Sequence, residues 1–497
     1  MAKLRSAVGD MGTKVGGMYT DLAALLVVIG LLMPVQVEAQ PTWKRVIGGI
    51  ERDVAHSIEA LPDGGAVICG STGSFGTLTG DIYLVRLSID GARVWSMTMG
   101  GEGAQEGKAV VALPEGGFLV IGSTNAGEHG GYDGYLARVT DDGELLWERT
   151  YGTPDWDFFE SAVIDQNTIV AAGYSYGMND PAGDLFLVKV DLDGEVLWMN
   201  DYGLVGEETG GYVGRRSDGM FVLSGSTGSM GDVDAIAFLI DQDGAEVWSV
   251  RVEGPSSERI LGMDLTSTDH ALLTGFQEME DGRRVMYLAN ISPDGIVEWS
   301  QPVSSAGNDW EARDVLSLAD GRIAVSGYTA EYGAGDRDVS LLFLNASGNF
   351  LSGPTYGGGG RDEVWSLDLA DDGAFYLAGS TTSYGPGMES MFIIRSDGDT
   401  LNGSVTSYND PVGLKPIHER DELTLGPVPV RSGGALYILG DGNTVRFAHI
   451  LDATGRIVAK VPVRSGRLEL PQLTPGIFVV HLFDGSGGVV NRRVLIE

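Results

Sequence analysis

The sequence predicts an all-β protein: a seven-bladed β-propeller followed by a small C-terminal β-sandwich. Three observations lead to this fold class. Tryptophan recurs about every 51 residues, each interval holds four strand-like segments, and glycine accounts for 75 of the 497 residues without a collagen period. Many short strands joined by glycine-rich turns, repeated at a fixed period, are typical of propellers, in which one four-stranded unit recurs around an axis.

An export signal is expected at the start of the chain. Residues 22–35 form an apolar run that follows three basic residues, and Val37-Glu38-Ala39 has the small-x-small pattern of a signal peptidase site. The run is shorter than the roughly 20 residues of a membrane-spanning helix. We therefore expect cleavage after about Ala39 and no integral membrane span in the mature chain. Retention of the segment as an anchor, and a true start at Met11 or Met18, stay open.

A period of about 51 residues runs from residue 40 to residue 408, and in five units a turn glycine precedes the tryptophan by four residues. The tryptophans stand at positions 43, 95, 147, 198, 248 and 299, and the last two periods keep the glycine, at Gly348 and Gly398, without the tryptophan. Within the second unit, strands are expected at residues 108–113, 118–121, 135–139 and 145–149. Period-two alternation supports each of them, and Asp142-Gly143 has the composition of a two-residue hairpin turn.

The segment that begins at Trp43 has the features of a fourth strand, yet no first three strands precede it. We expect it to complete the last blade, whose own fourth strand near residues 401–406 is poorly formed. Such a closure hides a strand edge that would otherwise invite aggregation.

These units resemble the tandem repeats of about 50 residues found in propellers of exported bacterial proteins. The resemblance rests on Leu61-Pro-Asp-Gly-Gly, Gly70-Ser-Thr, Asp81-Ile-Tyr-Leu-Val-Arg-Leu and Asp90-Gly-Ala-Arg-Val-Trp95, and it covers residues 41 to about 408. It implies a fold and no particular activity.

The composition changes at the C-terminal end. Residues 409–421 lose the period and are expected to form a linker. Residues 422–497 carry eight basic and six acidic side chains, whereas residues 40–421 carry a net charge of −38. Short strands separated by glycine turns in this tail predict the small β-sandwich.

The tail resembles the C-terminal sorting domain of the type IX secretion system. The resemblance rests on residues 423–430 (LTLGPVPV), 451–456 (LDATGR) and 470–480 (LPQLTPGIFVV). The chain departs from the usual pattern at Val428, where asparagine is common, and it ends in Glu497 where lysine is usual. The resemblance implies that the type IX machinery is a partner and that the protein is secreted or held at the outer cell surface. A plain accessory sandwich is the alternative.

Net charge and cysteine content exclude several function classes. The chain has 33 basic and 69 acidic residues, a formal charge of −36, so we expect no nucleic acid partner, because phosphate binding requires stripes of lysine and arginine. A single cysteine, Cys69, excludes an internal disulfide framework and a thiolate metal cluster.

One acidic position recurs ten residues after each tryptophan register point, where the first strand of a blade begins. It is occupied by Asp53, Asp157, Glu208, Glu258, Asp309 and Asp362, with Gln105 in the second unit. A ring of carboxylates at a channel mouth is one interpretation, and calcium is the ion it would hold. The interpretation that we favour is that each carboxylate caps its own turn by accepting backbone N–H groups, with no cofactor bound. A second recurrent acid, at Asp81, Asp133, Asp184, Asp234 and Asp338, fits the same turn chemistry.

Tyrosines gather in the loops between second and third strands. They are Tyr174, Tyr176, Tyr328, Tyr332 and Tyr384. Aromatic faces beside polar groups suit sugar or peptide binding, although tyrosine beside glycine can also pin a loop.

The sequence favours a surface or secreted propeller that serves in binding, adhesion or as a scaffold, with an extracellular glycan or protein as partner. The alternative is an extracellular polysaccharide-acting propeller enzyme, a hydrolase or lyase, which would need carboxylates converging at one channel mouth. No catalytic residue stands out in the sequence.

Overall fold

The computed structural model describes most of the chain from residue 42 to residue 496. It leaves out residues 1–41, 78–79, 102, 178–181, 205, 230–231, 255, 304–308, 399–404, 410–423, 427–429, 440–444, 452–456, 465, 485–488 and 497. The expected export signal lies outside the described residues, as does the linker apart from Asn409. All described elements are strands, which agrees with the all-β fold class.

Residues 43–409 form seven sheets in which neighbouring strands are mainly antiparallel. The first three sheets are β2 (Asp53–Ala60), β3 (Ala66–Thr72), β4 (Asp81–Leu87) and β5 (Arg93–Met99); β6 (Gln105–Ala112), β7 (Phe118–Thr124), β8 (Asp133–Val139) and β9 (Leu145–Tyr151); and β10 (Asp157–Asp165), β11 (Thr168–Ser175), β12 (Asp184–Asp191) and β13 (Val196–Tyr202). The next two are β14 (Glu207–Arg215), β15 (Phe221–Ser229), β16 (Asp232–Ile240) and β17 (Glu246–Val252); and β18 (Ser257–Leu265), β19 (Ala271–Glu278), β20 (Arg284–Ile291) and β21 (Val297–Pro302).

The last two sheets depart from the simple four-stranded order. The sixth contains β22 (Trp310–Ser317), β23 (Ile323–Thr329) and β24 (Asp338–Leu344), with the short strands β25 (Phe350–Ser352) and β26 (Thr355–Tyr356) both paired to β24. The seventh contains β27 (Asp362–Leu369), β28 (Phe375–Thr381), β29 (Ser390–Ser396), β1 (Trp43–Gly48) and β30 (Val405–Asn409), in that order.

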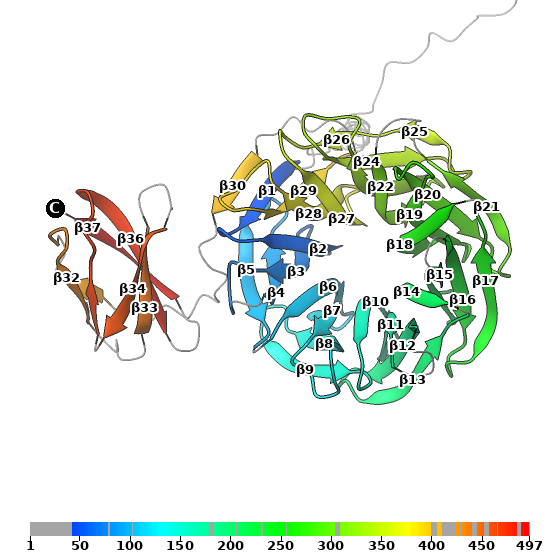
Figure 1. The fold of residues 1–497 in the computed structure, drawn as a ribbon, viewed down its shortest axis with the longest axis horizontal. Coiled ribbons are helices and arrows are strands. Elements are labelled where there is room, and N and C mark those ends of the chain that lie inside the picture. Colours follow the sequence, from blue (N-terminus) through cyan, green and yellow to red (C-terminus); the bar gives the residue numbers. More distant parts are fainter. Residues whose placement is uncertain are drawn as a thin grey trace, which may run out of the picture. The chain divides into compact units, whose positions relative to one another are not determined.

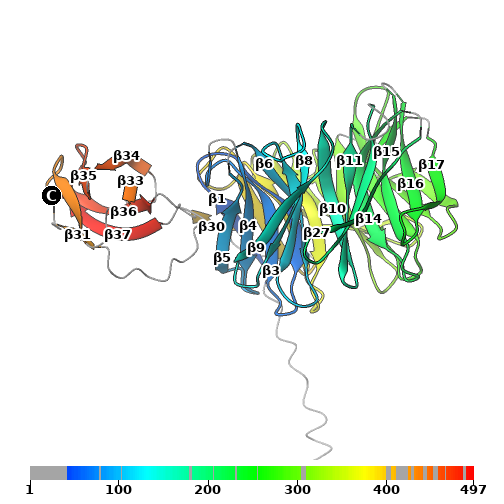
Figure 2. The same ribbon diagram turned by 90° about the horizontal axis from the view of Figure 1, so that it is seen from below.

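The seven sheets lie in a ring with their first strands toward the centre, a propeller-like arrangement (Figures 1 and 2). The N-terminal strand β1 pairs antiparallel with β29 and so takes the fourth position of the seventh sheet, as the unpaired Trp43 segment predicted. Strand β30 then adds to β1 in parallel. The inner strands join as well, since Ile58 in the first sheet donates its backbone N–H to Ser366 Oγ in the seventh at 3.2 Å.

Where the glycine–tryptophan period is complete, the tryptophan indole donates a hydrogen bond to the next sheet at five boundaries. The Trp43 indole donates to the carbonyl of Ile89 at 2.9 Å, and Trp95 donates to Asp141 at 2.8 Å, in each case in the outer hairpin turn of the following sheet. The turn glycines Gly91 and Gly143 have φ near +75°, and a Cβ there would lie 2.8 Å and 3.1 Å from these same tryptophan rings. Glycine is therefore required both by the turn and by the ring packed against it.

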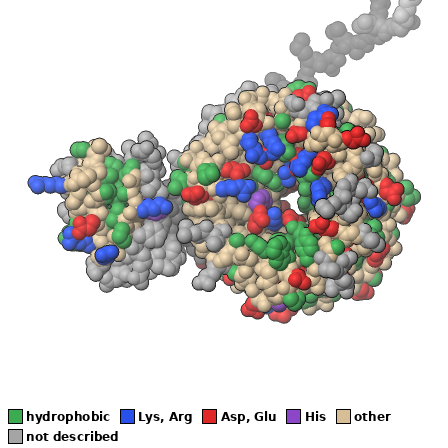
Figure 3. Space-filling model, viewed as in Figure 1, with side chains coloured by type: hydrophobic (Ala, Val, Ile, Leu, Met, Phe, Trp, Pro, Cys, Tyr) green, Lys and Arg blue, Asp and Glu red, His purple; other side chains and the backbone are tan. Residues whose placement is uncertain are grey.

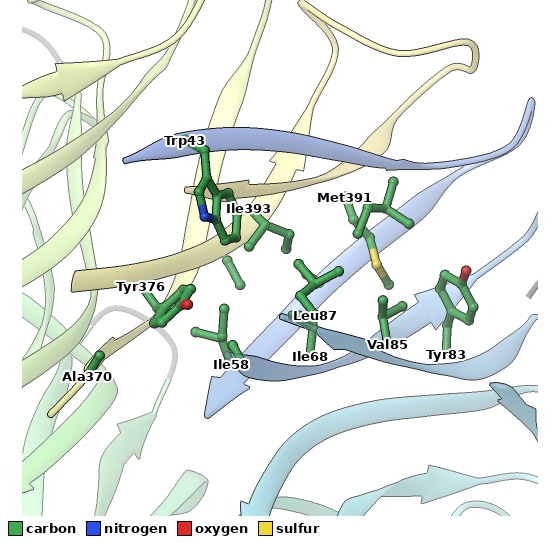
Figure 4. Packing of buried hydrophobic residues seen from close by; sticks show 14 of the residues in the cluster. Trp43, Ile58, Ile68, Tyr83, Val85, Leu87, Ala370, Tyr376, Met391 and Ile393 are labelled. Carbon is green, nitrogen blue, oxygen red and sulfur yellow. The ribbon is translucent and has the colours of Figure 1, made fainter. Parts of the chain in front are cut away.

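Hydrophobic side chains fill the space between neighbouring sheets. Figure 4 shows the cluster between the seventh and first sheets, where Trp43 meets Tyr376 edge-on at 5.8 Å between centroids, with Ile58, Ile68 and Ile393 around them. All five side chains are buried. At about 25 cal/mol per Å² of apolar surface removed from water, burial of this kind is the main stabilising contribution to the closure of the ring.

The C-terminal segment forms its own sheet and core. Its strands are β31 (Thr424–Gly426), β32 (Ala435–Leu439), β33 (Val445–Leu451), β34 (Ile457–Arg464), β35 (Arg467–Glu469), β36 (Gly476–Asp484) and β37 (Val489–Ile496). The hydrogen-bonded path runs β31-β32-β35-β34-β33-β36-β37. Alternating residues such as Ala448, Ile450, Val480 and Leu482 are buried in one cluster. A two-layered sandwich stays a prediction.

Candidate functional site at the centre of the ring

A chamber of about 600 Å³ opens at the centre of the ring, lined by side chains from the first strands of all seven sheets. Figure 3 shows this hollow with basic, acidic and histidine side chains around it and a group of hydrophobic side chains on its lower rim. It is the place where every repeat contributes to one surface, and it is therefore the candidate site.

A β-bulge in every first strand directs one residue toward the chamber. The extra residue re-aims its side chain and leaves the ladder, so the inner strands present seven such positions. They are His56, Lys108, Glu160, Gly211, Leu261, Arg313 and Trp365. All except Gly211 are among the residues that line the chamber. The bulge backbone repeats seven times, whereas the side chain it carries is different each time.

The glycine of the second strand makes the bulge sterically feasible. Gly70 pairs with Ala55 next to the bulge, and a Cβ on Gly70 would lie 1.9 Å from the carbonyl oxygen of Val54. At Gly122 the same construction gives 2.0 Å to the carbonyl oxygen of Glu106. The glycine of the recurrent Gly-Ser-Thr sequence is thus explained by close backbone approach.

Two glutamates with different protonation preferences flank a lysine in the chamber. Lys108 Nζ lies 3.2 Å from Glu106 Oε1 and 3.9 Å from Glu160 Oε1. Burial would raise the pKa of Glu106, but Lys108 outweighs it and the pKa lies below its ordinary value. Burial raises the pKa of Glu160, which Lys108 offsets only in part. Glu160 therefore keeps its proton to a higher pH than Glu106 does.

His56 is held as a neutral imidazole. Its Nδ1 lies 2.7 Å from the carbonyl oxygen of Gly107, which can only accept, so Nδ1 donates. Burial, with Lys108 adding to it, lowers the pKa of His56. The ring meets Trp365 edge-on at 5.9 Å, and its unprotonated Nε2 is on the side of Glu106, 3.7 Å from Oε1.

Five aromatic side chains form a continuous cluster beside the chamber, on the third sheet, the loop before it and the β7–β8 loop of the second sheet. Phe158 stacks between Tyr132 at 5.3 Å and Tyr174 at 4.9 Å. Trp156 meets Phe158 edge-on, and Tyr176 meets Tyr174 edge-on. Trp156 is 55% exposed, and Tyr174 also lines the chamber. The cluster offers flat apolar faces that continue into a polar cavity.

The predicted tyrosines do not come together as one group. Tyr174 and Tyr176 belong to the aromatic cluster. Tyr328 is buried and donates to Glu311 at 2.9 Å, Tyr384 donates to the carbonyl of Gly357 at 2.7 Å, and Tyr332 packs edge-on against Trp310 at 5.7 Å. The hydroxyls of Tyr328 and Tyr384 thus hold their own surroundings in place.

The recurrent acidic register lies beneath the turns that begin the first strands. Asp53 accepts from the backbone N–H of Gly49 at 2.7 Å, from Thr72 at 2.5 Å and from Ser74 at 2.6 Å. Asp157 and Asp362 accept the backbone N–H of Thr153 at 2.6 Å and of Gly358 at 2.7 Å, in the corresponding turns.

The remaining acids of the register also accept hydrogen bonds, but from other donors. Glu208 accepts from Thr227, and Glu258 accepts from Gln277 Nε2 at 2.7 Å. In the sixth sheet the equivalent position is Trp310, and Asp309 precedes it and accepts from the backbone N–H of Arg284 at 3.2 Å. Among the described residues, none of the seven register positions lines the chamber, and no group of three or more His, Cys, Asp or Glu is arranged to hold a metal ion.

Acids of neighbouring sheets face each other at the sheet-to-sheet boundary. Asp184 and Glu208 are such a pair, and burial together with hydrogen bonding to Glu208 raises the pKa of Asp184. On the inner strands, beyond the bulges, burial raises the pKa of Glu59 to about 8 and that of Asp314 to about 7. Asp314 lines the chamber and accepts the backbone N–H of Leu367 at 2.8 Å.

The bulge residues were missed by sequence reasoning, which followed what repeats. The available signal was the position three residues after the acidic register, or four residues after Asp309 in the sixth unit, where the residue type changes in every unit. In the part of the chain that the structure describes, no helix is long and apolar enough to cross a membrane.

No protein family and no curated protein matches the chain. Similar solved structures include the WD40 domain of Neurospora crassa Pan2, at 12% identity over 74% of this chain and 99% of that one, with a TM-score of 0.43. A polysaccharide lyase of family 25, an ulvan lyase, is similar at 11% identity over 72% and 97%, with a TM-score of 0.47. PorZ of Porphyromonas gingivalis, a surface component of the type IX secretion system, is similar at 11% identity over 90% and 74%, with a TM-score of 0.28. Identities and TM-scores this low say nothing about a shared ligand or activity.

Proposed function

We propose that this protein is a secreted or cell-surface seven-bladed propeller that binds an extracellular sugar chain at one end of its central channel. The observation that carries the proposal is the aromatic cluster of Tyr132, Trp156, Phe158, Tyr174 and Tyr176, which is continuous with a chamber of charged groups. Sugar rings present apolar C–H faces and polar edges, and this surface offers a partner for both.

The test is retention of the full-length chain on a panel of immobilised extracellular polysaccharides, with release of soluble sugar recorded in parallel. We expect retention without products, and we expect Trp156→Ala to weaken it about tenfold, which corresponds to about 1.4 kcal/mol. The matched control is Tyr332→Ala, since Tyr332 is 53% exposed but lies on the sixth sheet, outside the cluster. Equal losses in both variants, or no retention of the parent protein, would contradict the proposal.

A polysaccharide-acting enzyme is the second candidate, and one observation favours it. Glu106 and Glu160 converge on Lys108 in one chamber with their pKa values shifted in opposite directions. Such a pair is how one site keeps a base ionised and an acid protonated. Release of sugar in the retention assay, abolished by Glu160→Gln, would establish this function in place of simple binding.

The tail is proposed to direct export through the type IX secretion machinery. Its motif resemblance and its separate hydrophobic core support this role. Deleting residues 422–497 should leave the protein in the periplasm of a host that has the machinery, whereas the full chain should reach the cell surface or the medium. Equal distribution of both forms would make the tail an accessory domain.

A further inference from the structure

The side chains opposite the aromatic cluster point to the chemical class of the ligand, and this inference rests on the proposed function. Five arginines gather on the first strands and adjoining elements of the fifth to seventh sheets: Arg259, Arg284, Arg313, Arg337 and Arg361. This arginine cluster is unexpected in a chain of net charge −36.

The cluster has more cations than carboxylates. Among the described residues, the only carboxylates within ion-pair distance of it are Glu311 and Glu363. Glu311 is shared by Arg284 at 2.8 Å and Arg313 at 2.5 Å. Glu363 is shared by Arg337 at 2.5 Å and Arg361 at 2.8 Å, and Arg259 makes no ion pair with a described residue. Five guanidinium groups thus share two ion-paired carboxylates, and Glu278, which pairs across the strand with Arg284, is the next acid that acts on the cluster.

Neighbouring aromatic rings hold two of the guanidinium groups in place and leave them partly exposed to bind an anion. Arg284 Cζ lies over the Phe276 ring at 4.2 Å and Arg337 Cζ over the Tyr328 ring at 4.3 Å, and these contacts restrain both side chains. Their side chains remain 42% and 30% exposed. A guanidinium has five N–H donors in a fixed fork that matches a planar or tetrahedral anion, so groups that the protein holds in advance lose little entropy on binding one.

Two members of the arginine cluster border the same cavity as one member of the aromatic cluster. Arg259 and Arg313 line the chamber together with Tyr174. The overall negative charge does not prevent an anion from binding here, because the screening length at physiological salt is about 8 Å and contact distances are shorter. We propose that the ligand is an anionic sugar chain, whose ring faces lie on the aromatic cluster and whose carboxylate or sulfate groups are bound by the arginine cluster.

The experiment measures retention of the full-length chain on matched polymers that differ in charge. The pairs are polygalacturonate with its methyl ester, hyaluronan with its methyl ester, and dextran sulfate with dextran. We expect at least one acidic member to be retained about tenfold better than its neutral counterpart, with retention falling as sodium chloride is raised. The first two pairs report carboxylate recognition and the third reports sulfate recognition.

Variants separate this inference from the proposed function. Arg259→Gln and Arg361→Gln should each reduce retention of the acidic polymer several-fold, because each removes one guanidinium group from the cluster. The Arg361 substitution leaves the ion pair between Arg337 and Glu363 in place. Arg322→Gln, which removes the same charge in the turn after the far end of β22, is the matched control and should have no effect. Equal retention of acidic and neutral members would overturn the anionic class and leave sugar binding intact. No retention of any polymer would overturn both.

Discussion

Replacing Asp53 with alanine tests whether the recurrent acidic register is structural. The carboxylate is fully buried where the first sheet meets the seventh, and it accepts from the N–H of Gly49 and the hydroxyls of Thr72 and Ser74. Each buried donor left unsatisfied costs about 1–3 kcal/mol. Both hydroxyls can rotate toward other acceptors, whereas the Gly49 N–H cannot, so we expect a loss of about 3 kcal/mol for Asp53→Ala.

The effect is measured as a shift in melting temperature of the full-length chain. Unfolding entropy of about 2.1 cal/mol/K per residue over a ring of about 370 residues converts 3 kcal/mol into a decrease of about 4 °C. Asp320→Ala is the matched control, because Asp320 lies in an exposed turn, paired only with Arg322 among the described residues. It should leave the melting temperature unchanged. An equally unchanged value for Asp53→Ala would refute the capping role and return attention to a cation site.

Three further predictions concern the ion, pH and the cysteine. Because Asp53 and Asp362 already accept hydrogen bonds from their own turns, we expect millimolar calcium to leave the melting temperature unchanged; a rise of several degrees would support an ion site. Burial raises the pKa of Glu59 to about 8 and that of Asp314 to about 7, above the unfolded values, so their contribution to stability is present below about pH 4 and is lost as the pH rises through 7 and 8. Melting temperatures across this range should decline less in Glu59→Gln than in the parent protein, and parallel curves would contradict this. Burial raises the pKa of the Cys69 thiol, so Ellman's reagent should label it only after denaturation, and fast labelling of the native protein would show an open core.

Much of the fold could be predicted because closure of the ring imposes the same requirements on every sheet. The turn glycine must have a positive φ and must leave room for a tryptophan ring, so Gly91 and Trp95 recur as a pair in their two registers. The unpaired strand at Trp43 could likewise be predicted to pair with the open edge of the last sheet, which is β29. What the sequence could not specify was β30, whose parallel pairing with β1 follows no repeat in the chain.

The candidate site was harder to predict for the opposite reason. Sequence reasoning looked for residues that recur, and a carboxylate recurs at Asp53, Asp157 and Asp362 because the turn at the start of each of these first strands has an N–H group to satisfy. Bulge residues line the chamber instead, and His56, Lys108 and Trp365 occupy equivalent backbone positions with side chains of different types. A bulge is set by long-range pairing, so its register is difficult to read from one strand alone.

The second-strand glycine nevertheless contains the missing information. A glycine such as Gly173 in the middle of a buried strand weakens that strand, so its recurrence requires a compensating reason. The reason is the carbonyl of Phe158, which a Cβ on Gly173 would approach to 1.6 Å, next to the bulge at Glu160. A repeat that tolerates this cost in all seven sheets holds one inner position out of the ladder in each of them. Because that position makes no ladder pairing, its side chain can differ from sheet to sheet, and in six of the seven sheets the residue there lines the chamber.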